Sequence, residues 1–377
     1  MFVVTVEHSG VDRYSHELAK RMGVPTLESR RYLSLRESFH LLRRIRQHSD
    51  LVHLPSQHFA RYGLFLGRPF IVTVHDLMRL CFPLARETMQ EWMGLKLDIL
   101  GLKRARHIVA VSNCTKRDLV SYLKIPEARI SVIHNGLDRQ VFRPIGVRCF
   151  PFPYLLYVGT ERPRKNLSTL LSAFALVKNE SSGYRDLKLV KVGTPGRVDE
   201  FRRATQAEVK RLGLEGDVIF VESVSDGDLA AYYSSAVALV VPSLYEGFGL
   251  PLIEAMACGC PVIASRCSSL PEVAGDAALF FAPRDSEKLA RLIRRVVAEL
   301  DLRADLVKKG FERVQLFSWE RAAQQTLQVY HSVEAGLGLR ESEVEYREGL
   351  ATGRIKALDV QSAVHVSMPT GQVIIPK

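Results

Sequence analysis

The sequence predicts an α/β fold of two doubly wound, Rossmann-like domains that face each other across a cleft. A chain of 377 residues is long for one core and suits two domains. Short apolar runs alternate with amphipathic segments, as in parallel sheets covered by helices. The alternation stops at FRPIGVRCFPFP, which holds three prolines, and then restarts. We therefore expect domains at 1–145 and 146–335, followed by a tail at 336–377 that we leave unassigned.

The first half shows five strand patterns. They lie at the opening MFVVTVEHSG and at 50–54, 69–76, 107–112 and 129–138. Helical patterns separate them. These are VDRYSHELAKRM, a long segment at about 85–105, and TKRDLVSYLK.

The second half repeats this order. Its apolar runs are YLLYVGT, KLVKVG, DVIFVES, VALVVPS and PVIAS. The intervening and following helical patterns include NLSTLLSAFALVK, DEFRRATQAEVKRLG, DLAAYYSSA, 285–300 and 321–333. Ligands of such sheets bind at the carboxyl ends of the strands, so the candidate residues are sought there.

Composition places the chain among soluble globular proteins, with 47% hydrophobic and 25% charged residues. No apolar run approaches the roughly 18 residues of a membrane span. The opening MFVVTVEHSG has no basic leader, so we expect a cytoplasmic protein. Six scattered cysteines without a C-x-x-C pair are expected to be reduced thiols.

The net charge of +11 is confined to the first 150 residues, which hold 24 Lys/Arg against 13 Asp/Glu. The remainder holds 28 of each. This excess of basic residues either keeps the protein soluble or indicates that the first half binds an acidic partner, such as a phosphorylated substrate or an anionic membrane face. At 34–50, apolar residues near helical spacing stand among arginines, which suits a membrane surface but also ordinary core packing.

Two candidate clusters lie in the first half. Gly10 opens a helix pattern after a strand, so its backbone could approach a phosphate, although one glycine is no dinucleotide fingerprint. His75 and Asp76 end another strand, where a histidine could transfer a proton or bind a sugar hydroxyl, or serve only structure.

Two further clusters lie in the second half. In GTERPRKN, Arg162, Arg164 and Lys165 crowd a helix start, which favours a bound anion over a solvated charge run. In PSLYEGFGLPLIEAMACGCPVIAS, the glycines permit close approach of a ligand to the backbone, and Glu246 and Glu254 bracket the turn.

These glutamates, within YEGFGLPLIEAMACGCPV, resemble the E-x7-E signature of retaining nucleotide-sugar glycosyltransferases of family 4, which have the GT-B fold. VTVHDL, ARHIVAVSNCTKRDL, VIHNGLD and GTERPRKN also resemble blocks of that family, in the same order, over roughly residues 1–335. Two positions depart from the pattern. Thr160 stands where the family often has arginine, and HSG replaces a paired glycine.

The resemblance implies a role for each matching position. Arg164 and Lys165 would bind the donor diphosphate, with Gly10 beside it from the other domain. Glu254 would accept hydrogen bonds from the ribose hydroxyls. The remaining positions would serve the transferred sugar: Glu246 by direct contact, His75 beside the reacting centre, and the backbone of Gly247, Phe248, Gly249 and Leu250 by holding sugar and phosphate.

We therefore expect a retaining enzyme that moves a mannose- or glucose-like hexose from a nucleoside-diphosphate sugar to a glycan or lipid-linked acceptor. Retention could follow from double displacement at Glu246 or, as the resemblance favours, from front-face attack. No cofactor or metal is expected, and polysaccharide or glycolipid assembly at the inner membrane face is the expected setting.

Rival interpretations remain open at this point. Asp226 and Asp228 form a D-x-D triplet that could bind a metal, but Ser225 with Asp228 also makes a helix-capping pattern. The same fold could serve a sugar-nucleotide epimerase, a phosphorylase or a non-catalytic nucleotide-binding module. Nucleic-acid binding is disfavoured because no recognition motif accompanies the basic charge.

Overall fold

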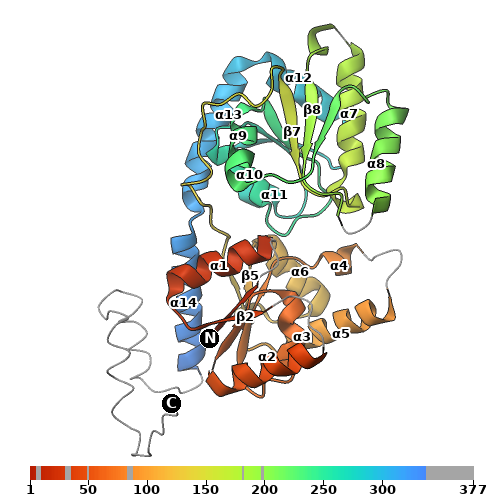
Figure 1. The fold of residues 1–377 in the computed structure, drawn as a ribbon. Coiled ribbons are helices and arrows are strands. Elements are labelled where there is room, and N and C mark those ends of the chain that lie inside the picture. The colour runs from red at the N-terminus through yellow and green to blue at the C-terminus, as the bar shows by residue number, and fades with distance from the viewer. Residues whose placement is uncertain are drawn as a thin grey trace, which may run out of the picture.

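The computed structural model describes residues 1–5, 10–29, 35–48, 51–82, 88–180, 182–196 and 199–336. Its core consists of two six-stranded parallel sheets, one in each half of the chain, with helices packed around them (Figure 1). Alternate residues of the strands enter separate apolar clusters on opposite faces of each sheet. The predicted fold class is confirmed.

The first sheet has the order β2-β1-β3-β4-β5-β6. Its strands are β1 (Phe2–Thr5), β2 (Thr26–Ser29), β3 (Val52–Leu54), β4 (Phe70–Val74), β5 (His107–Ala110) and β6 (Ile130–Val132). Its helices are α1 (Gly10–Met22), α2 (Leu35–His48), α3 (Ala60–Gly63), α4 (Met78–Cys81), α5 (Met89–Arg104) and α6 (Asn113–Leu123).

The second sheet has the order β12-β11-β10-β7-β8-β9. Its strands are β7 (Tyr154–Val158), β8 (Lys188–Val192), β9 (Val218–Val221), β10 (Ala238–Val241), β11 (Val262–Ser265) and β12 (Ala278–Phe281). Its helices are α7 (Leu167–Glu180), α8 (Asp199–Arg211), α9 (Asp226–Ser235), α10 (Leu250–Ala257), α11 (Leu270–Ala274), α12 (Ser286–Ala298) and α13 (Leu300–Arg313).

Two strands escaped prediction, β2 and β12, and both lie at an edge of their sheet. β12 is a short apolar run, ALFF, that was not singled out. For β2 there is a physical reason, because an edge strand is partly exposed and its sequence need not be continuously apolar. In β2, the sequence TLES alternates between exposed and buried residues and has only one large apolar side chain.

The last described helix, α14 (Trp319–Ala335), returns to the first domain and lies beside α1 (Figure 1). Trp319 is buried there, and the Tyr330 hydroxyl lies 2.8 Å from Nδ1 of His53 on β3. Gly136, which follows β6, lies so close that a Cβ on it would meet the backbone nitrogen of Trp319 at 2.3 Å. The segment that leads from the first domain to the second, at Gly136, and the segment that returns, at Trp319, therefore contact each other.

Direct contacts also hold the two domains together. The Glu272 carboxylate on α11 accepts the backbone N–H of Asn113 at 2.7 Å and that of Cys114 at 3.1 Å, at the start of α6. The Tyr245 hydroxyl donates to Asp118 on α6 at 2.6 Å. A carboxylate at a helix N-terminus is favourable because unpaired N–H groups point at it.

Two segments discussed in the sequence analysis, the C-terminal tail and the first glycine loop, lie largely outside the described residues. The unassigned tail lies outside the described residues except for Gly336, and so do residues 6–9 of the first glycine loop. Among the helices that are described, none is both long and apolar enough to cross a membrane.

Candidate active site between the two domains

The glycine-rich turn joins β10 to α10 and lies against the first domain. A Cβ on Gly247 would fall 1.7 Å from the carbonyl oxygen of His75, so only glycine permits this approach. Gly249 has φ +100°, a left-handed conformation that glycine adopts without strain. Pro251 stands in the first turn of α10, where the fixed φ of proline suits a helix start.

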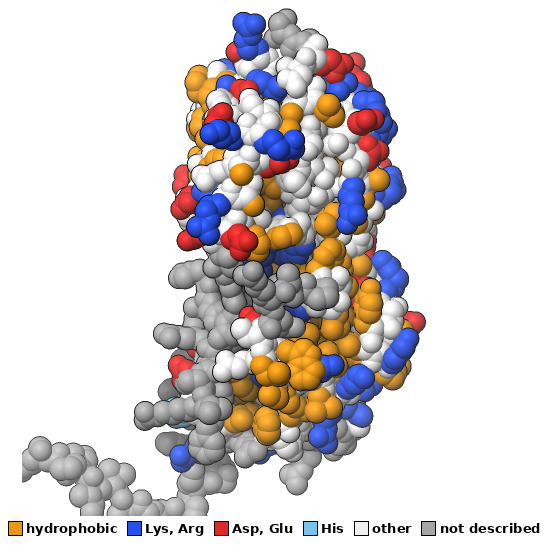
Figure 2. Space-filling model, turned by 90° about the vertical axis from the view of Figure 1, so that its right-hand side faces the viewer, with side chains coloured by type: hydrophobic (Ala, Val, Ile, Leu, Met, Phe, Trp, Pro, Cys, Tyr) orange, Lys and Arg blue, Asp and Glu red, His pale blue; other side chains and the backbone are white. Residues whose placement is uncertain are grey.

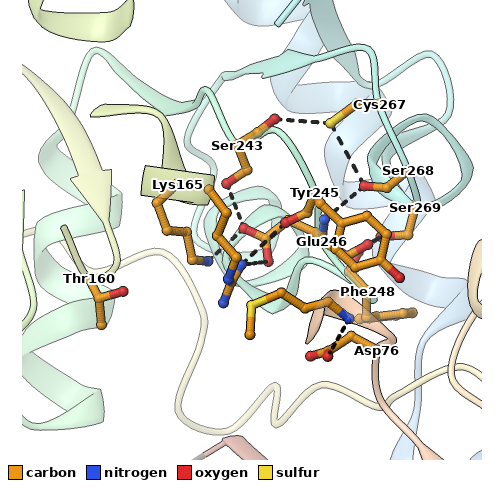
Figure 3. A network of polar contacts seen from close by, with 12 residues as sticks. Asp76, Thr160, Lys165, Ser243, Tyr245, Glu246, Phe248, Cys267, Ser268 and Ser269 are labelled. Carbon is orange, nitrogen blue, oxygen red and sulfur yellow. Dashed lines mark hydrogen bonds and ion pairs between the residues drawn. The ribbon is translucent and has the colours of Figure 1, made fainter. Parts of the chain in front are cut away.

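Glu246 meets two of the three cations of GTERPRKN at this turn, Lys165 (Figure 3) and Arg164. Lys165 Nζ donates to Glu246 Oε1 at 2.6 Å, and Arg164 lies 3.4 Å from Oε2. The Leu244 N–H also donates to the Arg164 carbonyl at 2.7 Å, which ties the two loops together. The positive charge of Lys165 and Arg164, from which the sequence predicts a bound anion, is thus partly balanced by the Glu246 carboxylate.

A group of serines holds the Glu246 turn in shape (Figure 3). Ser243 Oγ donates to the Glu246 carboxylate at 2.6 Å. Ser268 Oγ accepts the Glu246 N–H at 2.8 Å, and Ser269 Oγ donates to the carbonyls of Glu246 and Phe248, each at 2.9 Å. Ser243 follows β10, and Ser268 and Ser269 follow β11. The sequence analysis missed them because short polar segments at strand ends are common.

Glu254 lies on α10 and is 4% exposed. Its carboxylate accepts a hydrogen bond from Arg13 at 2.7 Å and another from the Tyr233 hydroxyl at 3.0 Å. Arg13 comes from α1 in the first domain and also pairs with Asp226. Sequence analysis did not single out Arg13, since on a helix pattern it is indistinguishable from a solvent-exposed arginine.

The two glutamates have pKa shifts of opposite sign. Burial alone would raise the pKa of Glu246, but the charges of Lys165 and Arg164, with hydrogen bonds from Lys165 and Ser243, lower it overall. Burial raises the pKa of Glu254, although Arg13 and Tyr233 act in the other direction. Glu246 is therefore held as a carboxylate, whereas the charge of Glu254 depends on Arg13.

The first-domain candidates lie close to this turn but have local partners. His75 Nε2 donates to the Pro55 carbonyl at 2.8 Å, which fixes a proton on that nitrogen, and the ring meets Tyr14 edge-on. The Asp76 carboxylate accepts the Met78 N–H at 3.1 Å. Gly10 begins α1, the helix that carries Arg13.

The loop that contains Thr160, one of the departures from the family pattern, is held by contacts within the second domain. Thr160 lies apart from Lys165 and Glu246 in Figure 3, and its carbonyl accepts the Tyr157 hydroxyl at 2.7 Å. The next residue, Glu161, is buried and forms ion pairs with Lys191 at 2.7 Å and Arg202 at 2.8 Å. This loop is thus tied to β8 and α8.

The D-x-D triplet caps α9. Ser225 Oγ accepts the Asp228 N–H at 3.1 Å and donates to its carboxylate at 2.7 Å, as the capping pattern predicts. Asp226 pairs with Arg13. Within the described residues, no group of three or more His, Cys, Asp or Glu side chains is arranged to hold a metal ion.

Comparison with known families accounts for both halves of the chain. Residues 1–141 match the family described as Glycosyltransferase Family 4, and residues 151–313 match Glycosyl transferases group 1. The chain belongs to the GT-B glycosyltransferases of family 4.

Named relatives agree with this assignment. The glycosyltransferase is 32% identical to the O-antigen chain mannosyltransferase B of Escherichia coli over 61% of each chain. It is 29% identical to the MMP alpha-(1->4)-mannosyltransferase of Mycolicibacterium hassiacum, over 72% of this chain and 67% of the relative. The match thus spans less than two thirds of the first relative's length.

Solved structures share the architecture. Sucrose-phosphate synthase from Thermosynechococcus elongatus is 26% identical, with a TM-score of 0.73 over 89% of this chain and 99% of that one. The Anabaena protein HepE, solved in complex with UDP-glucose, is 17% identical with a TM-score of 0.74, covering 88% of this chain and all of HepE. The likeness to HepE shows the fold alone.

Proposed function

We propose that this glycosyltransferase moves a mannose- or glucose-like hexose from a nucleoside-diphosphate sugar to a glycan or lipid-linked acceptor, with retention of configuration and without a metal. The observation that carries the proposal is the meeting of Lys165, Arg164 and Glu246 at the start of α10. The names of the mannosyltransferase relatives support the choice of sugar.

The cations would receive the donor diphosphate. An ammonium group has three N–H donors, and the hydrogen bond from Lys165 to Glu246 uses one of them. The first backbone N–H groups of α10 have no partner within the helix and carry its positive dipole end. As the bond to the sugar breaks, negative charge grows on the leaving diphosphate, and these fixed donors stabilise it.

The two glutamates would bind different parts of the donor. Glu246 is held as a carboxylate next to the cations, so it accepts from hydroxyls of the transferred sugar. Glu254 would accept from the ribose hydroxyls, with Arg13 keeping it charged. Backbone groups at Gly247, Phe248, Gly249 and Leu250 would hold sugar and phosphate between them.

The state of Glu246 favours front-face attack over a covalent intermediate. Both carboxylate oxygens are engaged, Oε1 by Lys165 and Ser243 and Oε2 by Arg164. Charge-assisted hydrogen bonds lower the nucleophilicity of a carboxylate. In the proposed route, the departing phosphate accepts the proton of the attacking hydroxyl, and His75 lies beside the reacting sugar.

The setting we propose is the cytoplasmic face of a membrane, where the enzyme assembles a polysaccharide or glycolipid. The basic excess of the first 150 residues suits an anionic surface. The relative from Escherichia coli is named for the O-antigen chain.

A donor screen followed by product analysis tests the proposal. A sugar nucleotide present at a hundred times its dissociation constant stabilises the fold by about 2.7 kcal/mol, which thermal unfolding detects among UDP-, GDP- and ADP-sugars. The selected donor is then incubated with glycan acceptors in the presence of a chelator. We expect a product with the donor's anomeric configuration. An epimerised donor without transfer, an inverted product or inhibition by the chelator would each contradict part of the proposal.

A further inference from the structure

Helix α5 has an unusual distribution of side chains. Its buried positions are Gly94, Asp98, Gly101 and Leu102, of which only one is a large apolar residue. Its exposed positions include most of its large apolar residues, with exposed fractions of 70% for Met89, 47% for Trp92, 51% for Met93, 36% for Leu97 and 48% for Leu100. A helix on the surface of a soluble protein normally buries its large apolar residues and exposes its polar ones.

Packing against α3 fixes this orientation. A Cβ on Gly101 would meet the Ala60 carbonyl oxygen at 2.0 Å, so a larger residue cannot take its place. Asp98 is 3% exposed and accepts two hydrogen bonds from Arg61, at 2.7 and 2.6 Å. Because Asp98 and Gly101 must face inward, the apolar side chains on the opposite side of the helix, Met89, Trp92, Met93, Leu97 and Leu100, face outward.

The exposed side chains form one surface. Trp92, Met93, Leu97 and Leu100 follow helical spacing, and Phe65, which is 54% exposed, follows the helix that packs on α5. Figure 2 shows hydrophobic side chains gathered beside Lys and Arg on the first domain, on the side that carries α5 in Figure 1. Large contiguous apolar patches on a protein surface mark a binding partner.

The charges beside the patch are mainly positive. Lys96, Lys103, Arg104 and Arg106 are exposed along and just after α5, against one exposed acid, Glu91, which caps the helix start. Lys96 Nζ lies 5.3 Å from the centre of the Trp92 ring. A second copy of the chain seated on this face would bring basic groups together, whereas an anionic bilayer accepts both the apolar and the basic side chains.

We propose that the outer face of α5, formed by Met89, Trp92, Met93, Lys96, Leu97 and Leu100, is the surface by which the protein binds an anionic lipid bilayer. The apolar side chains enter the boundary between headgroups and acyl chains, and the cations contact the headgroups. This inference adds a specific surface to the proposed function, and vesicle binding is measured without turnover. Its failure is therefore distinguishable from failure of the proposed reaction.

The test is flotation of the full chain with vesicles of phosphatidylcholine and phosphatidylglycerol, with phosphatidylcholine alone for comparison. Of the two tryptophans in the sequence, Trp319 is 1% exposed and Trp92 is 47% exposed. A blue shift of fluorescence on adding vesicles, and its quenching by brominated lipid, therefore report on α5. We expect binding and a blue shift with anionic vesicles, weakened by salt.

The variant Trp92→Ser/Met93→Ser/Leu97→Ser should lower the partition coefficient about tenfold or more. Lys96→Ala and Lys103→Ala should each lower it about fivefold. A matched control, Leu300→Ser/Leu316→Ser, removes apolar residues that are 67% and 46% exposed on the second domain and should bind like the wild type. Circular dichroism establishes that each variant folds.

Three results would overturn the proposal. The wild type could fail to bind anionic vesicles, or the α5 variant could bind as well as the wild type. Alternatively, the wild type could form a dimer that the α5 variant converts to a monomer, with no vesicle binding by either, which would make this face a self-association surface.

Discussion

Replacing Arg13 by alanine removes the cation that the first domain supplies to Glu254. Glu254 is 4% exposed, and its remaining partner is the Tyr233 hydroxyl. Asp226 also loses Arg13, but its side chain is 49% exposed, so water replaces that contact at little cost. The main effect is therefore to leave a buried carboxylate without its counter-charge.

The size of the effect follows from the burial of both partners. Removing one member of a fully buried ion pair costs about 3–5 kcal/mol, and a hydrogen bond to a charged group contributes about 1.5–3 kcal/mol. The Arg13 side chain is 30% exposed, so solvent screens the pair and the lower range applies. We expect Arg13→Ala to lower the free energy of unfolding by about 2 kcal/mol near neutral pH.

The loss should depend on pH with a defined sign. Burial already raises the pKa of Glu254 above its ordinary value of 4.5, and removal of Arg13 raises it further. Below 4.5 the group is protonated in both folded and unfolded states, so the cost is small. As pH rises through the interval between the unfolded and folded pKa, ionisation favours the unfolded state and the cost grows.

Urea unfolding followed by circular dichroism, at about pH 4 and about pH 7.5, measures this difference. Arg13→Lys is the matched control because it keeps a cation, and Glu254→Gln supplies the second background. In that background Arg13→Ala should cost much less, since no charge is left unpaired. Equal costs at both pH values, or equal costs in both backgrounds, would refute the reasoning.

Further predictions concern the turn around Glu246. Lys165→Met should lower kcat/KM for the donor by roughly 10²–10³-fold, measured by product release, while Lys165→Arg retains part of it. Glu246→Gln should leave measurable transfer, because front-face attack needs no nucleophilic carboxylate, whereas a glycosyl adduct trapped on Glu246 of the wild type and seen by mass spectrometry would show double displacement. Gly247→Ala should hold the domains apart, because its Cβ would overlap the His75 carbonyl, and small-angle scattering would show a larger radius than in the wild type. Tyr245→Phe should reduce thermal stability by about 1 kcal/mol through loss of the Asp118 hydrogen bond. The effect should be smaller in an Asp118→Ala background, where the carboxylate is already absent and the Tyr245 hydroxyl keeps the Leu77 N–H as a partner, at 3.3 Å.

Much of the fold was predictable because its signals are local. Buried parallel strands are short apolar runs, and helices show their own spacing. The prediction failed at β2, where edge position relaxes the demand for apolar residues, and at β12, an apolar edge strand of only four residues, ALFF, that was not singled out. It also did not foresee that α14, placed in the second domain by its position in the chain, packs beside α1.

The candidate site was predictable in the second domain, where a few turns carry most of it. Arg164, Lys165, Glu246 and Glu254 lie in two short segments whose glycines, charges and helix starts are visible in the chain itself. Lys165 and Arg164 form ion pairs with Glu246, so these two segments lie together in the structure.

The sequence alone thus determined which segments become strands and helices and which turns carry charge, because these depend on neighbours within a few residues. Only the tertiary structure decided that Arg13 faces Glu254 and that α5 turns its apolar side chains outward. Both depend on contacts between segments far apart in the chain: the approach of α1 to α10, and the space that Ala60 leaves at Gly101. Such contacts have no counterpart in local spacing.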